Sequence, residues 1–235
     1  MRPINRGDKP TDHQGHLLAV REASEYKEAL ERRLGPFCSY CERRLTVSLA
    51  VEHMQGKLAV PALELEWSNL LLACSNCNSA KPKSEIDLTL YYWPDTHNTA
   101  RAFTYDDAGD VHPAPALTPG ESQTASRTLE LTGLDRRPGH PKWRQGDRRW
   151  EDRRDAWKIA QDQHEDLQRR PTSTQRDKVL RVARQTGYFS VWMTVFRDDA
   201  DMCRRFIGAF PNTAVECFEE SGAPKPFTER EGASV

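Results

Sequence analysis

Two pairs of cysteines constrain the fold of this chain more than any other feature. Each pair has the spacing C-x-x-C, at Cys38/Cys41 and Cys74/Cys77, and about thirty residues separate them, a spacing at which two thiolate-bearing turns can close a tetrahedral zinc site. Redox-active pairs or buried thiols are the alternative, but the sequence shows no thioredoxin-like βαβ pattern around the cysteines. The sequence therefore predicts one zinc ion bound by four cysteines.

This predicted zinc site is structural, because four thiolates leave no open position for water. Zinc binds to small zinc-finger peptides with about 10–16 kcal/mol, whereas a whole domain is stable by only about 5–15 kcal/mol. We therefore expect loss of the metal to unfold the module that contains it.

The length of 235 residues is enough for one large domain or two small ones, with no need for disulfides. Composition changes near residues 112–122, where several prolines and a glycine interrupt regular structure. The sequence predicts a zinc-containing module at 1–112 and a helical domain at 113–235. The opening residues carry no apolar run that resembles a signal peptide, so we expect a cytoplasmic protein that does not enter a membrane.

The secondary structure of the first module is predicted from local patterns. Apolar residues recur every four positions from Tyr26 to Leu34, which predicts a helix ended by Gly35-Pro36. Apolar and polar residues alternate over 45–52, which predicts a strand whose Glu52 faces away from the apolar side. A short helix is expected at 75–81, before Pro82.

The second half is predicted to be mostly helical. Residues 148–170 contain almost no glycine or proline, and apolar residues from Val179 to Phe196 follow three- and four-residue spacing. The fold class that we expect is α+β, with a small zinc-bound core followed by an α-helical domain.

Between and beside the cysteine pairs lies a second set of residues that can carry chemistry. Val51-Glu52-His53 ends the predicted strand, Asn69 follows in Trp67-Ser68-Asn69, and the second pair runs directly into Asn78 and Lys81. Each residue alone has an ordinary explanation, such as a solvated glutamate or a helix-capping asparagine. Their joint order resembles the HNH endonuclease family, which implies a ββα-metal core.

That resemblance implies a role for each residue in hydrolysing a phosphodiester bond. His53 is the expected general base, because the ordinary pKa of imidazole, about 6.5, suits that role near neutral pH. Glu52 and Asn78 are the expected ligands of a catalytic divalent ion, and such oxygen ligands favour Mg²⁺ or Mn²⁺. Asn69 is expected to bond backbone across the loop and hold His53 in position. Lys81, three residues after Asn78, is expected on the same helical face and could contact substrate phosphate from there.

The sequence departs from the family pattern in two places. Glu52 stands where Asp or His is more common, and Met54-Gln55-Gly56-Lys57 replaces a proline-containing turn. The first departure lengthens an expected metal ligand by one methylene group.

The first half also looks like a narrower group, the PtuB-like HNH nucleases of Septu-type antiphage systems. The segments that carry this similarity are Cys38–Leu45, Val51–His53, Trp67–Leu72 and Cys77-Asn78. It implies a defence effector that cuts DNA with an ABC/SMC-like ATPase partner. An HNH nuclease of restriction or mobile-element type without that partner is an alternative. A non-catalytic zinc ribbon that binds nucleic acid through arginines of 136–154 is another.

Overall fold

A hairpin followed directly by a short helix forms the centre of the first half. The computed structural model describes residues 1–227. In it, β1 (Leu49–His53) pairs antiparallel with β2 (Leu70–Cys74), so that Leu49 lies opposite Cys74 and His53 opposite Leu70. Helix α2 (Ser75–Ala80) begins at the next residue. The α+β prediction, with a ββα core and a cysteine-rich zinc staple, is confirmed.

Strand β1 is shorter than its alternating pattern predicts, and the prediction that Glu52 faces solvent is wrong. Ser48 has a positive φ of 66°, which prevents the strand from starting earlier, and the side chain of Val47 is 72% exposed. Glu52 was expected to face away from the apolar side but is only 2% exposed. The reason is that every residue of its partner β2 is buried, and that a cation compensates the charge of Glu52.

The predicted N-terminal helix is present as α1 (Lys27–Leu34), preceded by the 3-10 turn η1 (Ala23–Tyr26). It ends at Gly35, whose φ of 74° lies in the left-handed region. Leu30 and Leu34 are fully buried, and α1 packs against β2. The helix thus covers the hairpin, as its spacing predicts.

Short elements connect the ββα unit to the second half. They are η4 (Leu88–Leu90), α3 (Thr99–Ala102), β3 (Phe103–Tyr105) and β4 (Val111–Pro113), whereas η2 (Pro61–Leu63) and η3 (Trp67–Asn69) lie in the loop between β1 and β2. Strands β3 and β4 form a second antiparallel pair. Residues 112 and 113 are therefore part of a strand, although the sequence pattern there predicts an interruption of regular structure.

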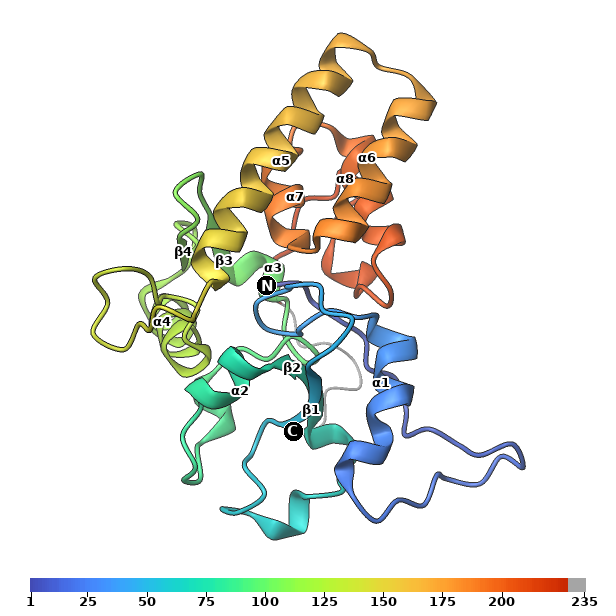
Figure 1. Ribbon diagram of the computed structural model, residues 1–235, viewed down its shortest axis with the longest axis vertical. Coiled ribbons are helices and arrows are strands. Elements are labelled where there is room, and N and C mark those ends of the chain that lie inside the picture. The colour runs from blue at the N-terminus through green and yellow to red at the C-terminus, as the bar shows by residue number, and fades with distance from the viewer. Residues whose placement is uncertain (228–235) are drawn as a thin grey trace.

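The second half is helical, as predicted. It contains α4 (Pro119–Thr132), α5 (Arg149–Arg169), α6 (Ser173–Thr186), α7 (Phe189–Val195), α8 (Ala200–Ala209) and the turn η5 (Val215–Cys217). Figure 1 shows α5 to α8 gathered at one end of the molecule and the β1–β2–α2 unit toward the other. No helix among residues 1–227 is long and apolar enough to cross a membrane.

Buried contacts join the two halves. The carboxylate of Glu42 accepts hydrogen bonds from the backbone N–H and the hydroxyl of Ser190, at 2.9 and 2.6 Å. One cluster of buried apolar residues runs from Met1 to Phe218 across both halves. The division into 1–112 and 113–235 remains a prediction; the boundary would fall within β4, and residues 228–235 lie outside the described part of the chain.

Candidate functional site

The four cysteines of the two pairs meet in one buried cluster. Their sulfur atoms all lie within 4.8 Å of one another, and all four residues are buried. The sulfurs of Cys41 and Cys74 are 3.7 Å apart, close to the separation of about 3.8 Å that a tetrahedron with Zn–S bonds of about 2.3 Å requires. The cluster therefore fits a structural zinc ion held by Cys38, Cys41, Cys74 and Cys77.

The electrostatics of the cluster support a cation at its centre. Burial raises the pKa of the Cys38 thiol, whereas hydrogen bonds from the neighbouring thiols lower the pKa of Cys74. Four buried thiols this close together cannot all lose their protons without a cation between them. A bound zinc ion would allow all four sulfurs to become thiolates.

Arg149 supports the cysteine cluster, and sequence analysis did not identify this role. It is 1% exposed, and its Nη1 donates to the sulfur of Cys77 at 3.2 Å and to the carbonyl of Thr132 at 2.8 Å. Asp147 binds the other side of the guanidinium through two hydrogen bonds of 2.8 and 2.6 Å. Burial alone would lower the pKa of Arg149, but Asp147 and the charge on Cys77 outweigh it, so that this pKa is raised.

His53 lies at the end of β1, and its ring is oriented by one backbone group. Its Nε2 is 3.0 Å from the carbonyl oxygen of Glu64. A carbonyl can only accept, so Nε2 must carry the proton. The other ring nitrogen, Nδ1, is then left with a free lone pair, as a general base requires.

Asn69 closes the loop that supplies this carbonyl. Its side-chain oxygen accepts from the N–H of Gln55 at 2.7 Å, and its amide donates to the carbonyls of Gln55 and Leu63 at 3.0 and 3.1 Å. Asn69 thus ties the residue two positions after His53 to the residue just before Glu64. These contacts are those expected of a residue that positions His53, a role that remains a proposal.

Glu52 and Lys81 form a buried ion pair. The Lys81 Nζ donates to Glu52 Oε1 and to the carbonyls of His53 and Met54, the last at 2.8 Å. Glu52 Oε2 accepts from the hydroxyl of Tyr40 at 2.6 Å. Burial raises the pKa of Glu52, and the bonds from Lys81 and Tyr40 oppose that rise in part.

The structure corrects the sequence-based placement of Lys81. The residue lies just beyond the last helical residue of α2, with an extended ψ of 145°, and therefore does not share a helical face with Asn78. All three N–H donors of its ammonium group are used inside the protein. In this conformation Lys81 has no donor left for a substrate phosphate.

The two residues proposed as ligands of a catalytic ion differ in their environment. Asn78 is exposed on α2 and offers an amide oxygen. Glu52 has the hard oxygen atoms that Mg²⁺ or Mn²⁺ prefers, but one of them is bonded to an ammonium group. As arranged here, Glu52 does not fit a divalent ion, because the Lys81 cation already neutralises its carboxylate.

Two other features among the described residues, a cluster of titratable side chains and a cavity, lie outside the ββα unit. Asp106, Asp110 and His112 cluster near the β3–β4 turn, but His112 pairs with Asp106 at 3.0 Å and Arg137 with Asp110 at 2.8 Å. The carboxylates of the cluster therefore already have hydrogen-bond or ion-pair partners within the protein.

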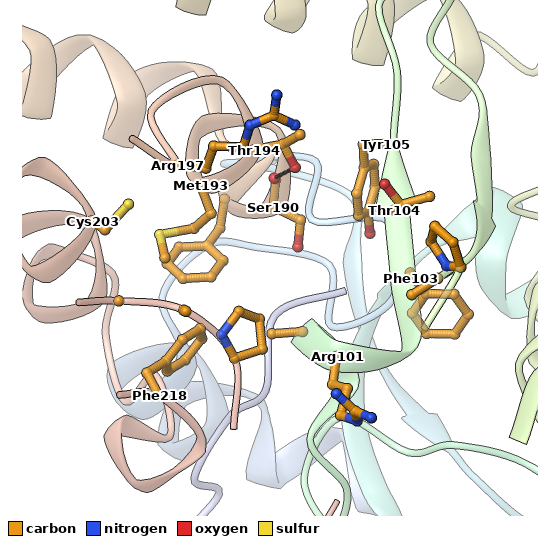
Figure 2. A pocket seen from close by; sticks show the side chains of 17 residues that line it. Arg101, Phe103, Thr104, Tyr105, Ser190, Met193, Thr194, Arg197, Cys203 and Phe218 are labelled. Atoms are coloured by element: carbon orange, nitrogen blue, oxygen red, sulfur yellow. Dashed lines mark hydrogen bonds between the residues drawn. The ribbon is translucent and has the colours of Figure 1, made fainter. Parts of the chain in front are cut away.

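The second feature is a cavity of about 340 Å³ between β3 and α7. Figure 2 shows Ser190 and Met193 facing Thr104 and Tyr105 across it. The hydroxyl of Thr194, which also lines it, donates to the carbonyl of Ser190 at 2.8 Å. None of the residues proposed for catalysis lines this cavity.

Comparison with known proteins adds one finding to this geometry. No curated protein matches the sequence. Residues 38–84, which include all four cysteines and every residue proposed above for catalysis, match the family model described as HNH endonuclease. This segment of the first half is therefore similar to an HNH endonuclease domain.

Proposed function

We propose that this protein is a metal-dependent endonuclease that hydrolyses phosphodiester bonds of DNA at His53. The observation that carries the proposal is the hydrogen bond between His53 Nε2 and the Glu64 carbonyl, on a ββα unit next to a four-cysteine cluster. This bond leaves Nδ1 free to take a proton. The family match to residues 38–84 supports a nuclease over other uses of that geometry.

In the proposed mechanism His53 removes a proton from the attacking water. Nδ1 accepts it, and the resulting imidazolium keeps its Nε2 proton on the Glu64 carbonyl. Asn69 restrains the loop that carries this carbonyl, so the ring does not have to be reoriented during the reaction. Asn78, which directly follows Cys77 on α2, has an exposed amide oxygen.

A divalent ion, which the HNH family implies, would neutralise the charge that develops on the scissile phosphate and the leaving oxygen. Glu52 and Asn78 are the positions that the family resemblance implies for this ion; Asn78 has an exposed amide oxygen, whereas Glu52 could bind the ion only if its ion pair with Lys81 opened. Their oxygen donors favour Mg²⁺ or Mn²⁺.

We also propose a biological setting, which rests on the resemblance of the first half to the PtuB-like nucleases. In it the protein is the cytoplasmic effector of an antiphage system and works with an ABC/SMC-like ATPase partner. A restriction or mobile-element nuclease with no such partner is the alternative. The two settings differ in whether an ATPase changes the cleavage rate of the purified protein.

Two of the arginines on which the non-catalytic zinc-ribbon alternative depends are buried, whereas others, such as Arg137 and Arg148, are 54% and 64% exposed. Arg149 and Arg153 are 1% and 2% exposed. Arg153 donates to the carbonyls of Gly109 and Leu134 at 2.7 and 3.2 Å. These two arginines stabilise the fold and are not available to bind a phosphate backbone.

The test is plasmid cleavage by the zinc-loaded protein with Mg²⁺, Mn²⁺ or EDTA. We expect cleavage only with an added divalent ion, and a loss of about 10²–10⁴-fold in rate for His53→Ala. His16→Ala is the matched control, because the His16 side chain is 75% exposed. Equal rates for His53→Ala and wild type, with both proteins folded, would contradict the mechanism.

A further inference from the structure

The basic loop, residues 136–148, links α4 to α5 and has no role in the proposed mechanism. Its segment 136–146 carries no Asp or Glu, in a chain whose formal net charge is −1. The Lys and Arg residues of this segment are Arg136, Arg137, Lys142 and Arg144. A local excess of positive charge on a nearly neutral protein indicates a surface for an anionic partner.

Three of these cations face solvent and can reach a partner. The side chains of Arg137 and Lys142 are 54% and 58% exposed. Lys142 pairs with Glu130, which is also exposed, at 3.1 Å, and such surface pairs contribute only about 0–1 kcal/mol, so a phosphate can replace the carboxylate. Arg137 pairs with Asp110 at 2.8 Å but has further N–H donors, because a guanidinium carries five.

Arg144 is the third exposed cation, and its charge is not balanced within the loop. Its guanidinium donates to the carbonyls of Pro141 and Trp143, at 3.4 and 2.9 Å. No carboxylate in the described part of the chain forms an ion pair with it. A phosphate oxygen would therefore be its first anionic partner.

Buried arginines hold both ends of the basic loop. Arg153 donates to the carbonyl of Leu134, just before the loop, at 3.2 Å. Arg149 binds Asp147, near the end of the loop, at 2.8 and 2.6 Å, and the Nε1 of Trp143 donates to the carbonyl of Asp147 at 3.3 Å. The exposed cations thus project from an ordered base, which lowers the entropy cost of binding a partner.

The same base places the loop beside the helix that carries Asn78. Nη1 of Arg149 donates to the sulfur of Cys77 at 3.2 Å, and Asn78 is the next residue on α2. Helix α4, which precedes the loop, packs against α2. Figure 1 shows the link between α4 and α5 on the side of the molecule where α2 lies.

We propose that the basic loop binds the phosphate backbone of the DNA substrate, beyond the scissile phosphate, through Arg137, Lys142 and Arg144. Duplex DNA carries one negative charge per about 1.7 Å of its axis, so a duplex bound at His53 presents further phosphates to its surroundings. Contacts with phosphates add affinity without sequence preference. This inference rests on the proposed nuclease function, because that function is the reason to expect a duplex at α2.

The first test measures binding of a fluorescein-labelled DNA duplex by anisotropy over a range of salt concentrations. All proteins are zinc-loaded and carry His53→Ala, so that the duplex stays intact. The triple variant Arg137→Gln/Lys142→Gln/Arg144→Gln should bind about tenfold or more weakly at low salt. The slope of log K against log salt should become shallower by about 2–3, because each phosphate contact contributes about 0.9.

The matched control removes the same charge from exposed positions of α6, as Lys178→Gln/Arg181→Gln/Arg184→Gln. Helix α6 lies at the end of the molecule away from α2 (Figure 1), so we expect this control to keep the salt slope of the parent protein. Equal losses in the two triple variants would show that only net charge matters and would overturn the inference. Unchanged DNA binding by the folded loop variant would also overturn it and would favour an acidic protein as the partner of the loop.

The second test locates the loop on bound DNA and leaves every charge in place. The photoreactive residue p-benzoylphenylalanine replaces either Gln145, exposed in the loop, or Gln185, exposed on α6. We expect irradiation to crosslink the duplex to position 145 and not to position 185. A protein that binds the duplex with unchanged affinity but forms no crosslink at position 145 would contradict the proposal.

Failure of the inference and failure of the proposed function give different results. DNA cleavage that depends on a divalent ion and His53, with an unchanged KM in the loop variant, refutes only the contact between loop and DNA. DNA binding that depends on the loop, without cleavage by the zinc-loaded wild type, supports the contact and refutes the nuclease.

Discussion

Replacing Arg149 with Met should show how strongly the zinc site depends on the helical half. The change removes hydrogen bonds to Cys77, Thr132 and Asp147 and leaves the Asp147 carboxylate, 7% exposed, without its cation. Breaking a buried ion pair on one side costs about 3–5 kcal/mol. We therefore expect the free energy of unfolding to fall by about that amount, a large part of a domain's usual stability.

Urea denaturation followed by circular dichroism measures this loss, and a colorimetric chelator measures zinc release in parallel. The control is Arg148→Met, whose side chain is 64% exposed and whose loss should change stability by about 0.5 kcal/mol or less. The double variant Asp147→Asn/Arg149→Met should regain part of the loss, because no unpaired charge remains. A loss below about 1 kcal/mol for Arg149→Met, with unchanged zinc release, would refute this account of the helical half.

Three further predictions concern other parts of the molecule. Removing zinc with a strong chelator should unfold the β1–β2–α2 unit, seen as lost circular dichroism that returns with Zn²⁺ but not with Mg²⁺. Asn69→Ala should lower the free energy of unfolding by about 2 kcal/mol or more, measured in urea, because it leaves buried backbone groups of the loop unpaired. Burial raises the pKa of Asp199, but hydrogen bonds from the Met202 N–H and from Arg176 outweigh this effect and lower it below its ordinary 3.8. The stabilising contribution of ionised Asp199 is therefore present above pH 3.8 and is lost as the pH falls through the lowered pKa. Asp199→Asn should make the urea midpoint of unfolding decline less steeply with falling pH in that range. An unchanged pH profile would contradict this assignment.

The sequence predicts the elements whose local signals agree with their final environment. The cysteine spacing predicts the buried cluster, and the apolar repeat before Gly35 predicts α1. Helix α1 depends on residues that are close in sequence, and the cysteine cluster depends on a tetrahedral metal geometry that few arrangements of four cysteines satisfy. The long helix α5 was also predicted within a residue or two at each end.

The sequence fails where distant residues decide the outcome. The alternating pattern predicts that Glu52 faces outward, but β2 is buried on both faces and Lys81 compensates the charge. Spacing likewise places Lys81 on the face of Asn78, whereas the chain leaves the helix one residue earlier. No sequence pattern indicates that Arg149 supports the cysteine cluster, because its partners Cys77 and Thr132 are distant in sequence.

The central claim, that the imidazole of His53 is the general base, is tested most directly by chemical rescue. His53→Gly removes the imidazole and leaves space at the end of β1, and single-turnover cleavage of a DNA duplex is measured with Mn²⁺ as free imidazole is added. The account predicts a very low cleavage rate without imidazole and a rate that rises with imidazole concentration. At a fixed imidazole concentration, the rate should also rise with pH, because the neutral form of imidazole, which accepts the proton, becomes more abundant. A rate close to wild type without imidazole, or no response to imidazole in a folded variant that binds Mn²⁺ and DNA, would contradict it.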